Sequence, residues 1–260
     1  MTPALAPIVA TRLDKAAVDN GFDRDLGRYG DWLCFGSSFS PLKIWLSGLS
    51  GGVLAVAVSR RNVADALEPL GGEWPGVLPQ GAVAARAVAD FATVERLLRR
   101  CYQLSRTLPD ELLHEFEKKT AGLPRTTEVE RLVVQRLGQG IFRAGLLEYW
   151  DGRCAVTGLA VPELLRASHI KPWATCETDA ARLDVFNGVL LAPHLDALFD
   201  GGFITFGSDG EVVLSAALDG PSRHALGLES GLRVSRPLGG HERYLTWHRD
   251  NLFRKAGSAQ

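Results

Sequence analysis

The feature that most constrains this chain is the sequence ASHIKPW at residues 167–173, in which an apolar, strand-like run stops at His169. Two short strands are predicted in this region, at Arg153–Thr157 and Glu163–Ile170. A turn is expected between them because glycine and proline bound residues 158–162. His169 is therefore expected at the end of a β-hairpin. A histidine at a strand end can be purely structural, so its meaning depends on the residues that follow.

An asparagine and a second histidine follow in the next part of the chain. Asn187 stands in the loop after His169 and precedes a glycine, so an ordinary Asn-Gly turn is one interpretation. The sequence HLDALFDGG at 194–202 predicts a short helix that ends at glycine. The order is thus histidine on a strand, asparagine in a loop and histidine on a helix.

Several linked motifs in this half of the chain occur together in one known family. They read CAVTG, ASHIKPW, NGVLL and HLDALFDGG, with flanks RLGQGIFRAGLLEYW and YLTWHRDNLFR. Together they resemble the HNH endonucleases of the ββα-metal fold, in a bacterial, restriction-type subgroup. The resemblance covers about residues 126–256 and implies metal-dependent hydrolysis of DNA. It also makes DNA the expected partner, with 5′-phosphate and 3′-hydroxyl ends as products.

Phosphodiester hydrolysis explains why such residues are needed. A water must lose a proton, and the extra charge on the phosphate and the leaving oxygen must be stabilised. A neutral imidazole can accept the proton near pH 7. By resemblance, His169 is the general base, and the amide of Asn187 orients that imidazole or the metal-binding loop.

The resemblance also implies one divalent metal ion, Mg²⁺ or Mn²⁺, with Ni²⁺ or Zn²⁺ as alternatives. Family members commonly carry the acidic residue before the histidine in the last helix, whereas here His194 precedes Asp196. Residues two apart on a helix do not share a face, so either of them can be the ligand. Asp200 lies one turn further along the face of Asp196, and Ser168 precedes the base; both are further candidate ligands.

Basic and aromatic residues are candidates for DNA contacts. In the C-terminal half these are Arg166, Lys171, Arg182 and Arg249, each of which can equally be an ordinary surface charge. In the N-terminal part, Trp32, Lys43 and Trp45 lie in the segment WLCFGSSFSPLKIWLSG, whose aromatic residues can stack a flipped or modified base. The alternative for these aromatic residues is the core of a small domain.

The expected architecture is α+β with two domains. Residues 1–105 are interpreted as a small α+β DNA-recognition domain, 106–125 as a helical connector, and 126–260 as the HNH nuclease domain. Within the first domain, two or three strands are expected between Asp31 and Ser59, with turns at 36–41 and 48–52. A short helix capped by Asn62 and a longer helix over 82–103 are expected to follow.

Composition narrows the class of protein. The 260 residues are 46% hydrophobic and 23% charged, as in a globular protein. The net charge is −1, so the chain has no overall positive charge that would indicate a nucleic-acid partner. No segment approaches the roughly 18 consecutive apolar residues of a membrane span, and no signal peptide is predicted. The four cysteines form no Cys-x-x-Cys pair, which argues against a thiolate zinc site. We expect a cytoplasmic protein.

The sequence thus predicts an HNH endonuclease that acts on foreign or modified DNA, and a homodimer would allow two nicks to become a double-strand break. A non-catalytic DNA-binding or regulatory protein with the same fold is one alternative. An RNase or toxin-like nuclease is the other.

Overall fold

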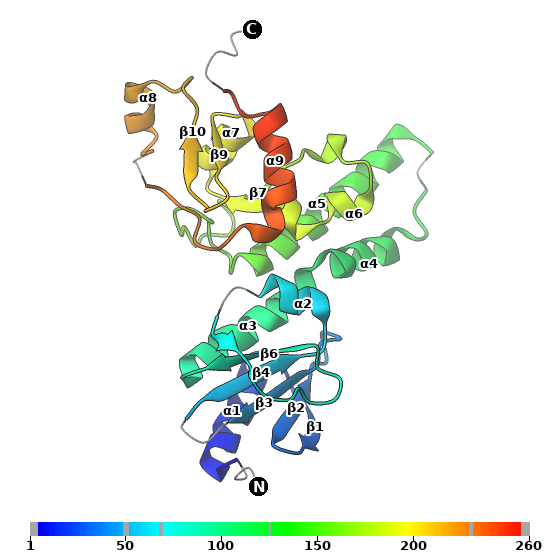
Figure 1. Cartoon of the computed structure of the whole chain (residues 1–260). Helices are drawn as coiled ribbons and strands as arrows, with labels where there is room; N and C mark the ends of the chain where they lie inside the picture. Colours follow the sequence, from blue (N-terminus) through cyan, green and yellow to red (C-terminus); the bar gives the residue numbers. More distant parts are fainter. Residues whose placement is uncertain (1–4, 49–51, 68–69, 125, 229–230, 256–260) are drawn as a thin grey trace. The chain divides into compact units, whose positions relative to one another are not determined.

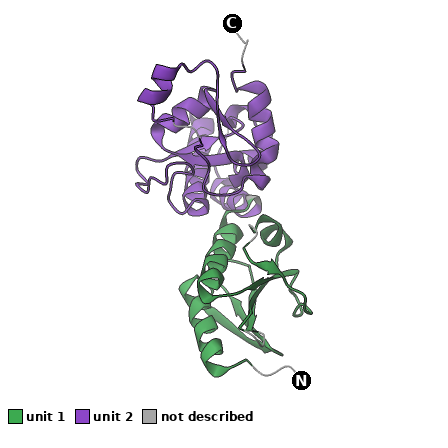
Figure 2. Ribbon diagram, turned by 60° about the vertical axis from the view of Figure 1, so that its left-hand side comes forward, with its two compact units in different colours: residues 1–108 green, residues 109–260 purple. Residues whose placement is uncertain are grey.

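The computed structural model describes residues 5–48, 52–67, 70–124, 126–228 and 231–255. Helices and strands are mixed along the whole chain (Figure 1). The chain divides into two compact units, residues 1–108 and 109–260 (Figure 2). Among the described residues, no helix is both long enough and apolar enough to cross a membrane.

The first unit is built on an antiparallel sheet of six strands in the order β1-β2-β3-β4-β6-β5. Most neighbours in the sheet are also neighbours in sequence, as expected for strands joined by short turns. Its elements are α1 (Pro7–Asp19), β1 (Arg24–Tyr29), β2 (Trp32–Gly36), β3 (Ile44–Gly48), β4 (Leu54–Val58), α2 (Arg61–Ala66), β5 (Gly72–Glu73), β6 (Ala84–Val88) and α3 (Phe91–Thr107).

The two faces of this sheet are covered differently. Helices α1 and α3 pack against each other and against the sheet, and Figure 2 shows both on the same side of it. Because successive side chains of a strand point to opposite faces, other apolar residues of the same strands lie on the second face, where they form a small core. That core consists of Trp32, Cys34, Trp45, Ala55 and Ala57, and Leu26, Trp74, Ala82 and Ala85 pack against it.

The two or three strands expected between Asp31 and Ser59 are confirmed, and the structure has three there, β2, β3 and β4. The turn expected at 48–52 lies partly outside the described residues. The helix expected over 82–103 is wrong in its first part, because residues 84–88 form strand β6 along the whole of β4. Helix α3 begins later, where the Asp90 side chain accepts from the Thr93 N–H. Asn62 does not cap α2, since the helix begins before it, at Arg61.

The second unit begins with α4 (Pro109–Thr120), which packs against α5 (Glu128–Tyr149). The helix of the expected connector therefore lies in this unit. The remaining elements are β7 (Arg166–His169), α6 (Asp179–Arg182), β8 (Gly188–Leu191), α7 (Pro193–Asp200), β9 (Ile204–Phe206), β10 (Val212–Leu214), α8 (Gly220–Ala225) and α9 (Glu242–Asn251), with 3₁₀ turns at Trp173–Thr175, Val185–Asn187 and Gly239–His241.

A two-stranded antiparallel pair, β7 and β8, forms the centre of this unit. The long helix α5 packs against both strands, and α7 packs against β7. Helix α5 begins at a capping box, because the Thr127 hydroxyl accepts from the Glu130 N–H while the Glu130 carboxylate accepts from the Thr127 N–H. The result is a strand pair followed directly by a short helix.

The hairpin expected from Arg153 to Ile170 is wrong. Residues 153–157 form turns, and β7 pairs with β8 instead, with His169 opposite Gly188. The Cys154 Sγ accepts from the N–H groups of Thr157 and Ala192, so this segment ties the start of α7 to a turn. His169 still ends a strand, but its partner strand comes after the loop that carries Asn187.

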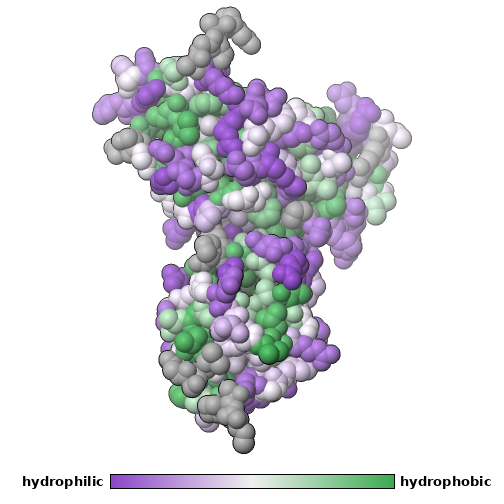
Figure 3. Space-filling model, viewed as in Figure 1, coloured by the Kyte–Doolittle hydropathy of each residue, from purple (hydrophilic) through white to green (hydrophobic). Residues whose placement is uncertain are grey.

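Hydrophobic side chains on the surface occur in small groups among hydrophilic ones on the face drawn in Figure 3. In the first unit, Val77 and Leu78 are among the exposed hydrophobic residues, at 89% and 38% exposure. Both belong to the loop between β5 and β6.

Candidate active site

His169 sits between two aromatic side chains at the end of β7. Its ring stacks on Phe142 of α5, with centroids 3.8 Å apart and planes inclined by 15°. Trp173 meets the same ring edge-on, with centroids 5.6 Å apart. These contacts restrict the imidazole to one orientation.

The main-chain oxygen of Arg182 lies 2.9 Å from Nε2 of His169. A carbonyl oxygen only accepts hydrogen bonds, so Nε2 carries the proton and Nδ1 keeps its lone pair in the neutral ring. Burial lowers the pKa of His169 to about 4, against the opposing effect of the Arg182 carbonyl. The ring is therefore neutral at pH 7, with Nδ1 as the atom that can accept a proton.

Asn187 is fully buried and holds the loop between the two strands together. Its Oδ1 accepts from the Lys171 N–H at 2.8 Å, and its Nδ2 donates to the carbonyls of Lys171 and Ala181 at 3.1 and 3.0 Å and approaches Cys176 Sγ at 3.3 Å. None of these bonds joins the amide to the His169 ring. Because Ala181 precedes Arg182, Asn187 positions the carbonyl that binds His169.

The glycine after Asn187 is required by packing. Gly188 is extended, with φ −150°, and starts strand β8, so the pair is not an ordinary Asn-Gly turn. A Cβ atom on Gly188 would lie 2.5 Å from the Phe142 ring and 2.7 Å from Leu146. The absence of a side chain therefore allows α5 to bring Phe142 against His169.

Helix α7 brings two carboxylates to the same pocket as His169. An open pocket of about 480 Å³ is lined by Arg166, Ala167, Ser168, His169, Pro172, Trp173, Asp196, Asp200 and Leu252. The Ser168 hydroxyl donates to Asp196 Oδ1. Desolvation and then the charge of Asp196 raise the pKa of Asp200 to about 6. His194 is exposed and does not line the pocket.

The donors in the pocket suit a hard cation. Among the described residues, no three His, Cys, Asp or Glu side chains are grouped so that they could hold a metal ion. Asp196, Asp200 and Ser168 supply oxygen atoms only, the ligands that Mg²⁺ and Mn²⁺ take together with several waters. Two neighbouring carboxylates with a raised pKa on one of them also fit a site that a cation would stabilise. The set does not resemble a tetrahedral zinc site of cysteine and histidine.

The four basic residues expected to contact DNA have different environments. Arg166 is exposed and lines the pocket. Lys171 forms an ion pair with Glu177 at 2.8 Å. The Arg182 guanidinium donates to Asp179, to the Trp173 carbonyl and to the Cys176 carbonyl, and Arg249 is held by Glu242, Thr246 and the Phe206 carbonyl. Arg182 and Arg249 thus bond to groups of their own unit while their side chains keep 23% and 26% exposure, and their contact with DNA stays a prediction.

The aromatic candidates of the first unit are core residues. Trp32 and Trp45 are 8% and 3% exposed and belong to the core on the open face of the sheet. Lys43 is exposed and lines a pocket of about 470 Å³ together with Trp45, Tyr29 and Pro41. Both tryptophans thus occupy the core, which was the alternative for them, and their contact with a DNA base stays a prediction.

Phe142 and Asp184 are site residues that the sequence did not indicate. Phe142 lies in the flank GIFRAG, where a helical pattern gives no sign that it meets a histidine from another element. Asp184 is buried, accepts from the Phe186 N–H and the Tyr244 hydroxyl, and pairs with Arg243. It anchors the end of the loop to α9. The sequence signal for Asp184 was an acidic residue directly before a turn, where its carboxylate can accept from the N–H two residues later.

Residues 154–207 match the model of the HNH endonuclease family. The matched segment spans β7, β8, α7 and β9, and so contains His169, Asn187, Asp196 and Asp200. No curated protein sequence matches the chain. Over this segment, the C-terminal half of the chain is therefore similar to the HNH endonucleases.

Proposed function

We propose that this protein is a metal-dependent endonuclease of the HNH type that hydrolyses phosphodiester bonds of DNA. One observation carries the proposal. His169, with its proton held on Nε2 by the Arg182 carbonyl, shares a pocket with Asp196 and Asp200. A proton acceptor beside two candidate metal ligands is the arrangement that metal-assisted phosphodiester hydrolysis needs.

His169 acts as the general base in this proposal. Its Nδ1 accepts a proton from the water that attacks the phosphate, while Phe142 and the Arg182 carbonyl keep the ring in place. The resulting imidazolium is buried, and the negative charge of a bound phosphodiester stabilises it. Asn187 is a positioning residue, since it acts through the loop and does not contact the ring.

Asp196 and Asp200, with Ser168, would hold the divalent ion. Bound there, the ion supplies positive charge to the phosphate and to the leaving 3′-oxygen. The serine hydroxyl fixes Asp196 Oδ1, so that the other carboxylate oxygen and Asp200 remain available. Arg166, exposed at the same pocket, is positioned to contact a neighbouring phosphate of the strand.

We also propose that the enzyme restricts foreign or modified DNA and that the first unit recognises the target. The support is the presence of a second compact unit with its own sheet and core in the same chain as the nuclease segment. A nuclease unit that contacts mainly phosphates needs another part of the protein to select its substrate.

The test is cleavage by the full-length protein of duplex DNA, single-stranded DNA and RNA, with Mg²⁺ or Mn²⁺ and with EDTA. We expect duplex DNA to be cut with metal and not with EDTA. Preferred cleavage of RNA would instead indicate an RNase, and no cleavage of any substrate would indicate a DNA-binding or regulatory protein. The proposal that the enzyme acts on modified DNA is tested by comparing its cleavage of four duplexes, which are methylated, hydroxymethylated, phosphorothioated and unmodified. Equal cleavage of all four would contradict that proposal.

A further inference from the structure

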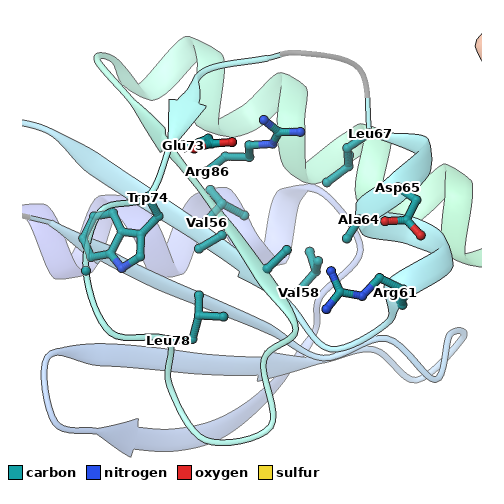
Figure 4. A pocket seen from close by; sticks show the side chains of 13 residues that line it. Val56, Val58, Arg61, Ala64, Asp65, Leu67, Glu73, Trp74, Leu78 and Arg86 are labelled. Atoms are coloured by element: carbon teal, nitrogen blue, oxygen red, sulfur yellow. The ribbon is translucent and has the colours of Figure 1, made fainter.

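The first unit contains a pocket beside its tryptophan core, and the two share Trp74 and Ala85. It has a volume of about 450 Å³, within the range of about 300–1,000 Å³ that is common for small-ligand sites. It lies between β4, β6, α2 and the segment from Glu73 to Leu78 (Figure 4). All of its lining residues belong to the first unit.

Small apolar side chains line the sheet side of this pocket. They are Val56 and Val58 of β4 and Ala84 of β6, with Ala64 of α2 beside them. Trp74 forms one wall. Its indole meets Trp32 edge-on at 5.2 Å, and its Nε1 donates to the Val77 carbonyl at 3.4 Å, so the ring is held in place. A flat apolar floor next to a fixed aromatic ring suits a planar ligand group.

Two arginines reach the pocket from different elements. Arg61 comes from α2 and Arg86 from β6, and Figure 4 shows both guanidinium groups at the pocket. Neither guanidinium has a hydrogen bond or an ion pair with any residue in the described ranges. Glu73 lies opposite Arg86 in the β5–β6 pairing without such a bond. Unpaired guanidinium groups at a concave site are suited to phosphate oxygens.

Two carboxylates narrow the class of ligand. Asp65 and Glu73 also line the pocket, one beside Arg61 on α2 and one on β5. They would repel a ligand that carries only negative charge. They would accept hydrogen bonds from a ligand with amino or ring N–H groups. A planar group with such donors, joined to a phosphate, is a nucleotide.

We propose that this pocket binds a nucleotide, with its phosphate on Arg61 and Arg86 and its base on the apolar floor beside Trp74. The choice of a nucleotide as ligand rests on the proposed nuclease function, because such an enzyme meets nucleotides as units of its substrate. A nucleotide within a DNA strand and a free nucleotide share this chemistry. The site differs from the one expected from the sequence, which centred on Trp32, Lys43 and Trp45.

The experiment measures binding by the full-length protein in EDTA, so that no cleavage occurs. The probes are the four deoxynucleoside monophosphates, inorganic phosphate and a short fluorescent single-stranded oligonucleotide. The double variant R61Q/R86Q is compared with wild type, and R99Q is the control, because Arg99 is an exposed arginine of α3 in the same unit. We expect the double variant to weaken nucleotide binding by about tenfold or more and R99Q to stay within about twofold.

Binding of the monophosphates, weakened in the double variant, would assign the pocket to free nucleotides. Binding of the oligonucleotide alone, weakened in the same way, would assign it to a nucleotide within a strand. Equal affinities of wild type and double variant for every probe would overturn the proposal. So would inorganic phosphate binding as tightly as the monophosphates, because the base would then contribute nothing.

Cleavage assays separate this inference from the proposed function. If R61Q/R86Q binds every nucleotide probe and cuts duplex DNA as wild type does, the pocket proposal fails and the nuclease remains. If wild type cuts nothing with Mg²⁺ or Mn²⁺ but still binds nucleotides through these arginines, the nuclease proposal fails and the pocket remains.

Discussion

His169 and Arg182 are joined by a hydrogen bond of 2.9 Å from the imidazole Nε2 to a main-chain oxygen. The carbonyl is held because the side chain of the same arginine donates to Asp179 and to two carbonyls of its own loop. Asn187 secures the preceding residue, Ala181. The proton of the proposed base is therefore placed by a residue whose charge would suggest a DNA contact.

Arg166 and Arg182 are expected to differ in the salt dependence of DNA binding. R166Q should weaken binding and reduce the slope of log K against log salt concentration by about one, since one phosphate contact is lost. R182Q should leave that slope unchanged and lower the cleavage rate, because the loop that orients His169 loosens. The measurement is fluorescence anisotropy over a salt series in EDTA, beside cleavage rates with Mg²⁺. An R182Q slope reduced as in R166Q would show that Arg182 contacts DNA.

Asn187→Ala should destabilise the second unit. The change leaves the buried N–H and C=O groups of Lys171 and the Ala181 carbonyl without their side-chain partner, which should cost about 3 kcal/mol of unfolding free energy. Urea denaturation measures the effect. Asn251→Ala is the matched control at an exposed helix end and should stay within about 0.5 kcal/mol. Equal stabilities of the two variants would contradict the anchoring role.

Variants of Asp196 and His194 test which of these two residues of α7 binds the metal ion. Asp196→Asn should lower metal-dependent cleavage strongly and raise the Mg²⁺ concentration needed for half-maximal rate, because Asp196 lines the pocket. His194→Ala should stay within about twofold of wild type, since the residue is exposed outside it. A titration of cleavage rate against Mg²⁺ makes the comparison. If H194A lost cleavage activity and D196N kept it, His194 rather than Asp196 would be the metal ligand.

His248 should make the stability of the second unit depend on pH. It is fully buried, and its ring stacks on Phe199 with the ring centroids 4.0 Å apart. Its ring nitrogens form hydrogen bonds with the Thr205 hydroxyl and the Phe199 carbonyl. Burial lowers its pKa below the ordinary value of 6.5, and Arg249 lowers it further. The unfolded chain then binds a proton that the folded chain does not, so the unfolding free energy is retained above about pH 6.5 and falls as pH decreases below it.

Urea denaturation between pH 7.5 and pH 5 checks this expectation. His248→Gln should show a shallower loss of stability on acidification than wild type, by up to about 1.4 kcal/mol per pH unit. The exposed His224 provides the control, and His224→Gln should follow the wild-type curve. A wild-type slope in H248Q would mean that other groups cause the dependence.

Local signals in the sequence predicted the elements whose patterns are self-contained. The apolar runs of β2, β3 and β4, the capping box of α5 and the glycine end of α7 each depend on neighbouring residues only. Strand β6 could not be recognised, because its alanine-rich sequence also fits a helix and only its pairing with β4 decides. The pairing of β7 with β8 likewise depends on contacts across a loop.

The sequence predicted which types of residue form the site better than it predicted the role of each residue. His169, Asp196 and Asp200 reach one pocket as the motif order suggested. The direction of each arginine side chain, in contrast, is set by carbonyls and carboxylates that become neighbours only in the fold. For that reason the sequence did not indicate the protein partners of Arg182 and Arg249, nor that Phe142 packs on His169.

The most direct test of the central claim is the cleavage of plasmid DNA by His169→Ala with Mg²⁺ or Mn²⁺. His114→Ala is the matched control, because His114 is an exposed histidine of α4 in the same unit. Loss of a general base should lower the cleavage rate by about 10²–10⁴-fold, with DNA binding in EDTA unchanged. H114A should cut as wild type does. Equal cleavage rates for H169A and wild type would contradict the assignment of His169 as the base.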